Sequence, residues 1–375
     1  MMNIAKHLAI KIGPRVSGTP QESAAARFIL KEFQKLGLDC RVQPFRYLGW
    51  QQKSKPSLTV LSPFRKALQV APVAYSGSTP REGIEGTLRF FGNTYLFPRL
   101  MEPPKYAIMS DSGENLGSVI VQPGARSKPI PNQWLHIIQQ PMILVCEEQF
   151  APVEEAISTD KMVRVHLKSV AKYVQDVESY NVIAKLQGAG KDTIIIGGHH
   201  DSIEGSPGAI DNASGVEAIF RVAERLIKRK SKHSFEFITW GGHEWGLFGS
   251  QYYVKSAREQ GTIKNIKACL TLDVLGCGDY LWIWAGPKRF RRLVEDRLKR
   301  SQLARQRELR FEGTLIGSDD YNFSADGIAH AMLMDWPAPN LHLPEDTYNR
   351  IEEDKVEFGT QVALRMVQMI EKKAG

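Results

Sequence analysis

Two histidines and three carboxylates stand where strand-like runs of the sequence end in loops. His199 follows an apolar run that passes through two glycines, and Asp211 lies in a loop rich in glycine and proline. Glu244 and Asp273 each follow another apolar run, and His342 stands in the stretch NLHLPEDT. In an open α/β sheet, ligands bind outside the carboxyl ends of the strands. We therefore expect these five side chains to converge, although they are far apart in the sequence.

Imidazole and carboxylate groups without a thiolate are typical ligands of Zn²⁺, with Mn²⁺ and Co²⁺ as alternatives, and an odd carboxylate can bridge two ions. Each residue alone has a simpler explanation, since an aspartate in a Gly/Asn/Ser loop is usually an Asx turn or a helix cap. The combination of five such residues at strand ends favours a metal centre.

The stretch FEFITWGGHEWGLFGS interrupts a strand at Gly241 and Gly242 and then presents His243 beside Glu244. It is not the helical HExxH zinc motif, because Leu247 occupies the position of the second histidine. Trp245 follows directly; it either lines a substrate pocket or packs in the protein interior.

The elements that must position these residues lie in a part of the chain where apolar strands alternate with helices, and this part differs from a β-rich part between them. Apolar runs at residues 181–186, 192–200, 234–240, 267–276 and 330–336 read as strands, and helical segments lie between several of them, which indicates a largely parallel sheet covered on both faces. Thr19, Pro20 and Gly37 bound a helix near the N-terminus.

Between these parts, short β-rich runs alternate with Pro/Gly turns. We therefore predict an α/β domain with a mixed, largely parallel sheet flanked by helices, made of residues 1–42 and 170–375. A small β-rich domain of residues 43–169 is inserted into it.

Composition and length limit the remaining choices. The 375 residues are 42% hydrophobic and 24% charged, which is typical of a globular protein, and no apolar run reaches the roughly 18–20 residues of a membrane span. The N-terminal stretch lacks the apolar core of a signal peptide. The four cysteines are not in CxxC spacing, so we expect reduced thiols and a cytoplasmic location.

The net charge of +8 is concentrated in residues 288–310, which hold ten Lys/Arg and three Asp/Glu. Phe290, Leu293, Val294 and Leu298 recur there at helical spacing, which predicts an amphipathic helix with a basic outer face. A solvated face is the preferred explanation of this charge, so we expect neither a nucleic-acid nor a membrane partner. Nucleic acid or another acidic surface as a partner is the alternative.

The chain resembles the co-catalytic zinc exopeptidases, a family that includes bacterial leucyl aminopeptidases and glutamate carboxypeptidases. The resemblance is carried, in the order of the family, by the stretches RVSGTPQESAAARFILKEFQKLGLD, YNVIAKLQG, GGHHDS, PGAIDNASGV, HEWGLFGSQYY, LTLDVLG, GSDDYNF and HLPEDT. The β-rich insertion stands where many members carry a protease-associated domain.

The resemblance implies a role for each residue that matches a family motif. His199 and Asp273 are expected to bind one of two zinc ions, and Glu244 and His342 the other. Asp211 is expected to bridge both ions. A peptide with a free amino terminus is the expected substrate.

Outside the metal ligands, the resemblance implies that Asp201 orients His199, and the sequence departs from the family at three positions. His243 stands where the family has a glutamate that acts as general base, and histidine can do this because its ordinary pKa of about 6.5 lies near neutrality. His200 replaces a tyrosine or leucine, and Asp320 replaces a common histidine; both are expected to contact substrate. Asp320 or Glu345 could alternatively supply the base.

Three functions are therefore open. The preferred one is a metal-dependent aminopeptidase that uses His243 as base. The alternatives are an acyl transfer of the glutaminyl-cyclase type on the same site and a non-catalytic or degenerate relative that binds metal or peptide. The sequence does not indicate the oligomeric state.

Overall fold

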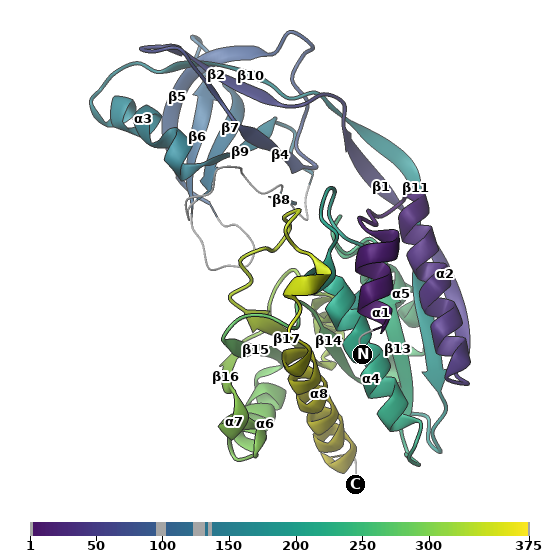
Figure 1. Cartoon of the computed structure of the whole chain (residues 1–375). Coiled ribbons are helices and arrows are strands. Elements are labelled where there is room, and N and C mark those ends of the chain that lie inside the picture. Colours follow the sequence, from purple (N-terminus) through teal and green to yellow (C-terminus); the bar gives the residue numbers. More distant parts are fainter. Residues whose placement is uncertain (1–2, 95–102, 123–131, 134–136, 374–375) are drawn as a thin grey trace. The chain divides into compact units, whose positions relative to one another are not determined.

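The computed structural model describes residues 3–94, 103–122, 132–133 and 137–373 (Figure 1). The chain divides into two compact units, one of Met1–Tyr47 with Glu178–Gly375 and one of Leu48–Val177. These boundaries lie a few residues beyond those we placed at 43 and 169. Strands β1 (Asp39–Gln52) and β11 (Ala171–Leu186) run through both boundaries without a break, so no turn residue in the sequence marks them.

The first unit is built on an eight-stranded sheet in the order β1-β11-β13-β12-β14-β17-β15-β16. β12 pairs in parallel with β13 and β14, and β14 with β17, whereas β11–β13 and β15–β17 are antiparallel. The predicted mixed, largely parallel sheet is thus confirmed. Its remaining strands are β12 (Thr193–His199), β13 (Ser234–Trp240), β14 (Ile266–Leu272), β15 (Tyr280–Gly286), β16 (Glu308–Glu312) and β17 (Ala329–Trp336).

Helices cover both faces of this sheet because successive strand residues point to opposite sides. In β12, Ile194 and Ile196 pack with α2, α4 and α8 on one face, whereas Ile195 packs with α5 on the other. The helical elements of the unit are α1 (Asn3–Lys6), η1 (His7–Ile12), α2 (Pro20–Lys35), η2 (Ala209–Ala213), α4 (Ser214–Leu226), α5 (Phe248–Glu259), η3 (Ile263–Asn265), α6 (Lys288–Lys299), α7 (Leu303–Gln306), η4 (Asp319–Asp326), η5 (Tyr348–Arg350) and α8 (Glu353–Lys373).

The predicted N-terminal helix forms as expected. Thr19 is the N-cap residue of α2 and its hydroxyl accepts a hydrogen bond from the amide of Glu22, while Pro20 is the first helical residue. Gly37 follows the helix with φ +75°, a conformation that glycine adopts without strain. Cap residues therefore locate both ends of this helix.

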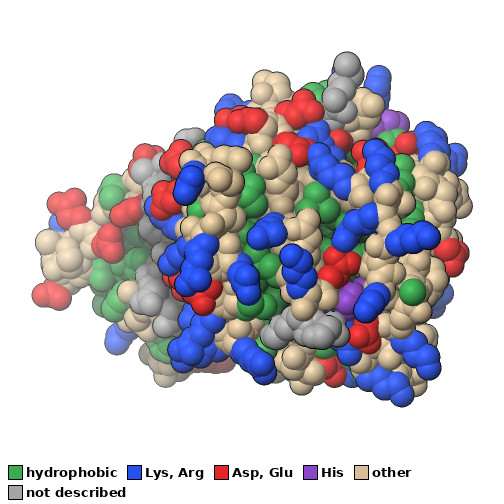
Figure 2. All heavy atoms as spheres, turned by 90° about the horizontal axis from the view of Figure 1, so that it is seen from below, with side chains coloured by type: hydrophobic (Ala, Val, Ile, Leu, Met, Phe, Trp, Pro, Cys, Tyr) green, Lys and Arg blue, Asp and Glu red, His purple; other side chains and the backbone are tan. Residues whose placement is uncertain are grey.

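Only the first part of the basic segment, residues 288–310, forms the predicted amphipathic helix. α6 buries Phe290, Val294 and Leu298 and exposes most of its Lys and Arg side chains, as predicted, but it ends at Lys299. The expectation of one helix to residue 310 was wrong, because the apolar repeat stops at Leu298 and β16 begins at Glu308. In the view of Figure 2, Lys and Arg side chains are scattered among acidic, apolar and other side chains and do not form one continuous patch.

Among the described residues, the second unit has a nine-stranded sheet in the order β3-β2-β10-β5-β6-β7-β9-β4-β8 and one helix. Its two apolar clusters are separate from those of the first unit. The elements are β2 (Ser57–Ser62), β3 (Lys66–Leu68), β4 (Val70–Ala74), β5 (Ile84–Asn93), β6 (Pro104–Met109), β7 (Asn115–Gln122), β8 (Asn132–Gln133), β9 (Met142–Cys146), α3 (Glu147–Ser158) and β10 (Arg164–Lys168). Its identification as a protease-associated domain stays a prediction.

All four cysteines are free thiols, and three of them are buried. Among the described residues, no helix combines the length and the apolar character needed to span a membrane.

Candidate metal centre

The five predicted ligands meet at one edge of the sheet of the first unit. β12 ends at His199, and Asp273 follows the last residue of the neighbouring strand β14. Glu244 follows β13 by four residues, in the bend that begins at Gly241 and Gly242. The carboxyl ends of three adjacent strands therefore supply three of the five residues, as the sequence predicted.

Asp211 is brought to this edge by the side chain of its neighbour Asn212. The amide of Asn212 donates to the carbonyl of Leu272 over 2.9 Å, and its oxygen accepts from the backbone N–H groups of Val274 and Gly215 at 3.2 Å and 3.0 Å. The start of α4 is thus tied to the end of β14, which places Asp211 beside Asp273.

The distances between ligand atoms fit two metal sites that share Asp211. His199 Nε2 lies 3.0 Å from Asp211 Oδ1 and 3.2 Å from Asp273 Oδ1. His342 Nε2 lies 3.1 Å from Asp211 Oδ2 and 3.4 Å from Glu244 Oε2. Ligands about 2.0–2.1 Å from a tetrahedral Zn²⁺ are themselves about 3.3 Å apart. Each half of the cluster therefore has the spacing of a tetrahedral set, with one oxygen of Asp211 in each.

An unsatisfied oxygen supports the same conclusion. Glu244 Oε1 is buried and has no hydrogen-bond partner among the residues that the structure describes. A buried carboxylate oxygen without a partner is costly, unless a cation or water binds it. The donor set and its geometry therefore fit metal ions.

The electrostatics of the cluster show how strongly it attracts positive charge. Burial alone would lower the pKa of His199, but Asp273, Asp201 and Asp211 outweigh it and hold that pKa well above its ordinary value. Burial opposes protonation of His342 in the same way, and Glu244 and Asp211 raise its pKa. Protons on the two imidazoles thus balance the carboxylates here, and metal ions compete with those protons for the same atoms.

Asp201 organises the site without joining either metal set. Its Oδ1 lies 3.5 Å from His199 Nδ1, and its two oxygens accept from the backbone N–H groups of His243 and Glu244 at 3.2 Å and 3.1 Å. The carboxylate therefore links His199 to the loop that carries Glu244. This position suits the orienting role that the resemblance implied.

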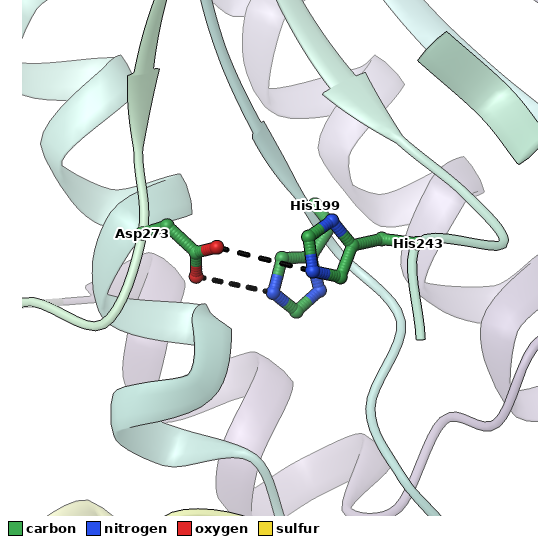
Figure 3. Close-up of side chains that lie close together, drawn as sticks. All are labelled: His199, His243 and Asp273. Atoms are coloured by element: carbon green, nitrogen blue, oxygen red, sulfur yellow. Dashed lines mark hydrogen bonds and ion pairs between the residues drawn. The ribbon is translucent and has the colours of Figure 1, made fainter. Parts of the chain in front are cut away.

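His243 lies flat against His199, with ring centroids 3.9 Å apart and planes inclined by 7° (Figure 3). Both rings point Nε2 toward Asp273, and His243 Nε2 is 3.9 Å from Asp273 Oδ2. This distance exceeds the spacing of about 3.3 Å within a tetrahedral set. His243 therefore lies beside the candidate ligands His199 and Asp273 and not among them. Its side chain is 11% exposed.

Two of the residues that we expected to contact substrate, His200 and Asp320, are buried. His200 is fully buried and its Nε2 lies 4.0 Å from Glu22 Oε1, because it leaves the strand on the side opposite His199. Asp320 is also buried and accepts a hydrogen bond from the hydroxyl of Ser318. Neither side chain reaches solvent, so the structure gives no support to substrate contact by either.

Trp245, a predicted pocket wall, and Glu345, a predicted alternative base, are not buried. Trp245 is half-buried next to Glu244, so its role as a pocket wall stays a prediction. Glu345 is exposed, and its alternative role as the base stays a prediction.

Four residues around the site were missed by sequence reasoning. Asp319 hydrogen-bonds His243, and Asp346 accepts from the backbone N–H groups of Ile210 and Asp211. The guanidinium of Arg15 donates to four backbone carbonyls. Glu22 lies under the bend at Gly241. A signal existed only for Asp319, in the adjacent pair of aspartates of GSDDYNF.

Comparison with known proteins adds independent evidence on ancestry. The profile of peptidase family M28 matches residues 181–367. An aminopeptidase of Pseudomonas aeruginosa is 26% identical over 300 residues, or 72% of this chain and 55% of that protein. Aminopeptidase YwaD of Bacillus subtilis is 25% identical over 400 residues, covering 98% of this chain and 83% of that protein.

The match to other curated relatives is partial. It spans 23% of a probable leucine aminopeptidase 2 from Aspergillus fumigatus, at 37% identity over 117 residues. The chain thus spans about half or less of the length of the Pseudomonas and Aspergillus relatives.

Two solved structures show the same fold. An aminopeptidase from Aneurinibacillus sp. strain AM-1 superposes with a TM-score of 0.74 at 24% identity, covering 98% of this chain and 92% of that one. BSAP, a zinc aminopeptidase from Bacillus subtilis, gives 0.72 at 19% identity, with 98% and 93% covered. These matches confirm the resemblance to the co-catalytic zinc exopeptidases.

Proposed function

We propose that this chain is a zinc-dependent aminopeptidase that binds two metal ions and removes the amino-terminal residue of peptides. The observation that carries the proposal is the pair of ligand sets that share Asp211, with all four interatomic distances between 3.0 and 3.4 Å. The names of the family relatives support the reaction class, and the zinc aminopeptidase BSAP supports zinc as the metal.

Each residue of the cluster has one task in this proposal. His199 and Asp273 would hold one ion, Glu244 and His342 would hold the other, and the carboxylate of Asp211 would contribute to both sets. When bound, a pair of such ions lowers the pKa of a shared water toward neutrality and polarises the carbonyl of the scissile bond.

His243 takes the place of the general base. Its Nε2 accepts the proton of the attacking water and then returns it to the nitrogen of the leaving amine, so that the proton is conserved over one cycle. The side chain is partly exposed, which lets it meet a water and a substrate that enter from solvent.

Hydrolysis of leucine p-nitroanilide and of short peptides by the zinc-loaded protein tests the proposal. Wild type should be active, and His243→Ala should lose about 100- to 10,000-fold in kcat, since a positioned base contributes about that much. His243→Glu should retain activity because a carboxylate can accept the same proton. If wild type were inert on every aminoacyl and peptide substrate while His243→Glu was active, the native protein would be a degenerate relative.

A further inference from the structure

Asp319 holds the imidazole of His243 from the side that faces away from the metal sets. Its Oδ2 lies 2.9 Å from His243 Nδ1, and the side chain of Asp319 is fully buried. Its other oxygen, Oδ1, accepts a hydrogen bond from the hydroxyl of Ser250 over 2.5 Å, and Ser250 in turn accepts from the amide of Asn322 over 2.9 Å. The carboxylate is therefore fixed by α5 and by η4 before it meets the histidine.

This contact decides which nitrogen of His243 carries the proton. A carboxylate only accepts hydrogen bonds, so Nδ1 must be the donor, and the lone pair of the neutral ring is then on Nε2. Nε2 is the atom that points toward Asp273 in Figure 3. The opposite tautomer would present an N–H group to the site, which could not accept a proton.

The ring is also fixed in orientation. It is held between Asp319 at one nitrogen and the parallel ring of His199 at 3.9 Å, so rotation about its side-chain bonds would break one contact or the other. A glutamate at position 243 needs no such partner, because both its oxygens can accept a proton and neither can donate to a carboxylate.

We infer that Asp319 is a positioning residue that fixes the tautomer and the orientation of His243, so that Nε2 of this histidine can serve as the base. The inference rests on the proposed function, in which His243 is that base. In this inference, the histidine that replaces the family's glutamate at position 243 depends on the buried carboxylate of Asp319.

The test is a double-mutant cycle in the zinc-loaded protein, with kcat and KM for leucine p-nitroanilide measured for all four forms. Asp319→Asn should lower kcat by about 10- to 100-fold in the His243 background, the usual cost of removing a partner that orients a functional histidine. KM and bound zinc should not change. In the His243→Glu background, the same Asp319→Asn substitution should change kcat by less than about 3-fold, because a glutamate does not use the contact.

The matched control is Asp326→Asn, which makes the same chemical change on η4 at a residue that pairs with Arg258. It should leave kcat unchanged in both backgrounds. An equal loss from Asp319→Asn in the two backgrounds would show a merely structural role and would overturn the inference. Loss of bound zinc from Asp319→Asn and from His243→Ala would also overturn it, since His243 would then be a metal ligand.

A second readout does not depend on activity or on a folded variant. In the zinc-loaded wild-type protein, ¹⁵N NMR of labelled histidine should show His243 protonated at Nδ1 and unprotonated at Nε2. The reverse tautomer would contradict the inference. If wild type proved catalytically inert, the proposed function would fail, whereas the tautomer would still decide the role of Asp319.

Discussion

The free energy of unfolding should depend on pH through Glu22, a buried carboxyl group beneath the metal-binding loop. Its Oε1 accepts a hydrogen bond from Ser179 Oγ over 2.5 Å, and its Oε2 accepts from the backbone N–H of Gly18 over 2.6 Å. Burial, with a smaller contribution from Asp201, raises the pKa of Glu22 from 4.5 to about 8. The folded protein therefore keeps a proton on this group at neutral pH.

The sign and size of the effect follow from proton linkage. Between pH 4.5 and about 8 the unfolded chain has lost the proton and the folded chain still holds it. The unfolded state thus binds fewer protons, and the contribution of Glu22 to the free energy of unfolding falls as pH rises, by about 1.4 kcal/mol per pH unit. Over the whole interval this amounts to a loss of about 5 kcal/mol, as an upper limit.

Glu22→Gln removes this dependence and keeps both hydrogen bonds, since a glutamine amide can accept from Gly18 and donate to Ser179 Oγ. Urea unfolding followed by tryptophan fluorescence at pH 5.5, 6.5 and 7.5 provides the assay. The stability of the variant relative to wild type should rise by about 1.4 kcal/mol per pH unit. The matched control is Glu32→Gln, elsewhere on α2. A difference between Glu22→Gln and wild type that stays constant with pH would refute the reasoning.

Two further substitutions test how the ligand loops are held. Gly241→Ala should destabilise the protein by about 2–4 kcal/mol and reduce zinc occupancy, because the new Cβ would lie 2.4 Å from Ser179 Oγ and 2.6 Å from the carbonyl of Tyr180. Thermal unfolding and metal analysis measure this, and an unchanged Tm would contradict it. Arg15→Met should cost a similar amount, because it leaves the buried carbonyls of His200, Pro207 and Gly208 without the guanidinium that now donates to them at 2.5–2.7 Å. Retention of wild-type stability and zinc content by this variant would show that the loop does not depend on Arg15.

The sequence predicted that the five candidate ligands lie close together, and it could do so for a physical reason. Parallel strands end at one edge of the sheet, so a polar residue after each apolar run can be placed there without knowledge of packing. His199 and Asp273 follow this rule directly. Asp211 lies in η2 and His342 in a loop, and their convergence was expected from the residue types and from the family resemblance.

Residues that act by packing or by a loop's exact path could not be predicted in this way. Asp319 and Asp320 are adjacent and chemically identical, and only the turn of η4 decides that Asp319 meets His243 while Asp320 meets Ser318. Arg15 is a single charged residue outside any periodic pattern, yet it is fully buried. The order of the strands in the second unit was likewise beyond the sequence, because it depends on long-range pairing.

The central claim is that two metal ions share Asp211. Metal analysis of the purified, zinc-loaded protein by mass spectrometry, together with calorimetric titration of the apo protein with Zn²⁺, tests it most directly. The account predicts about two zinc ions per chain, and loss of tight binding in Asp211→Asn, whose side chain cannot supply two anionic oxygens. A single ion per chain, or two ions that bind equally well to Asp211→Asn, would contradict the shared site.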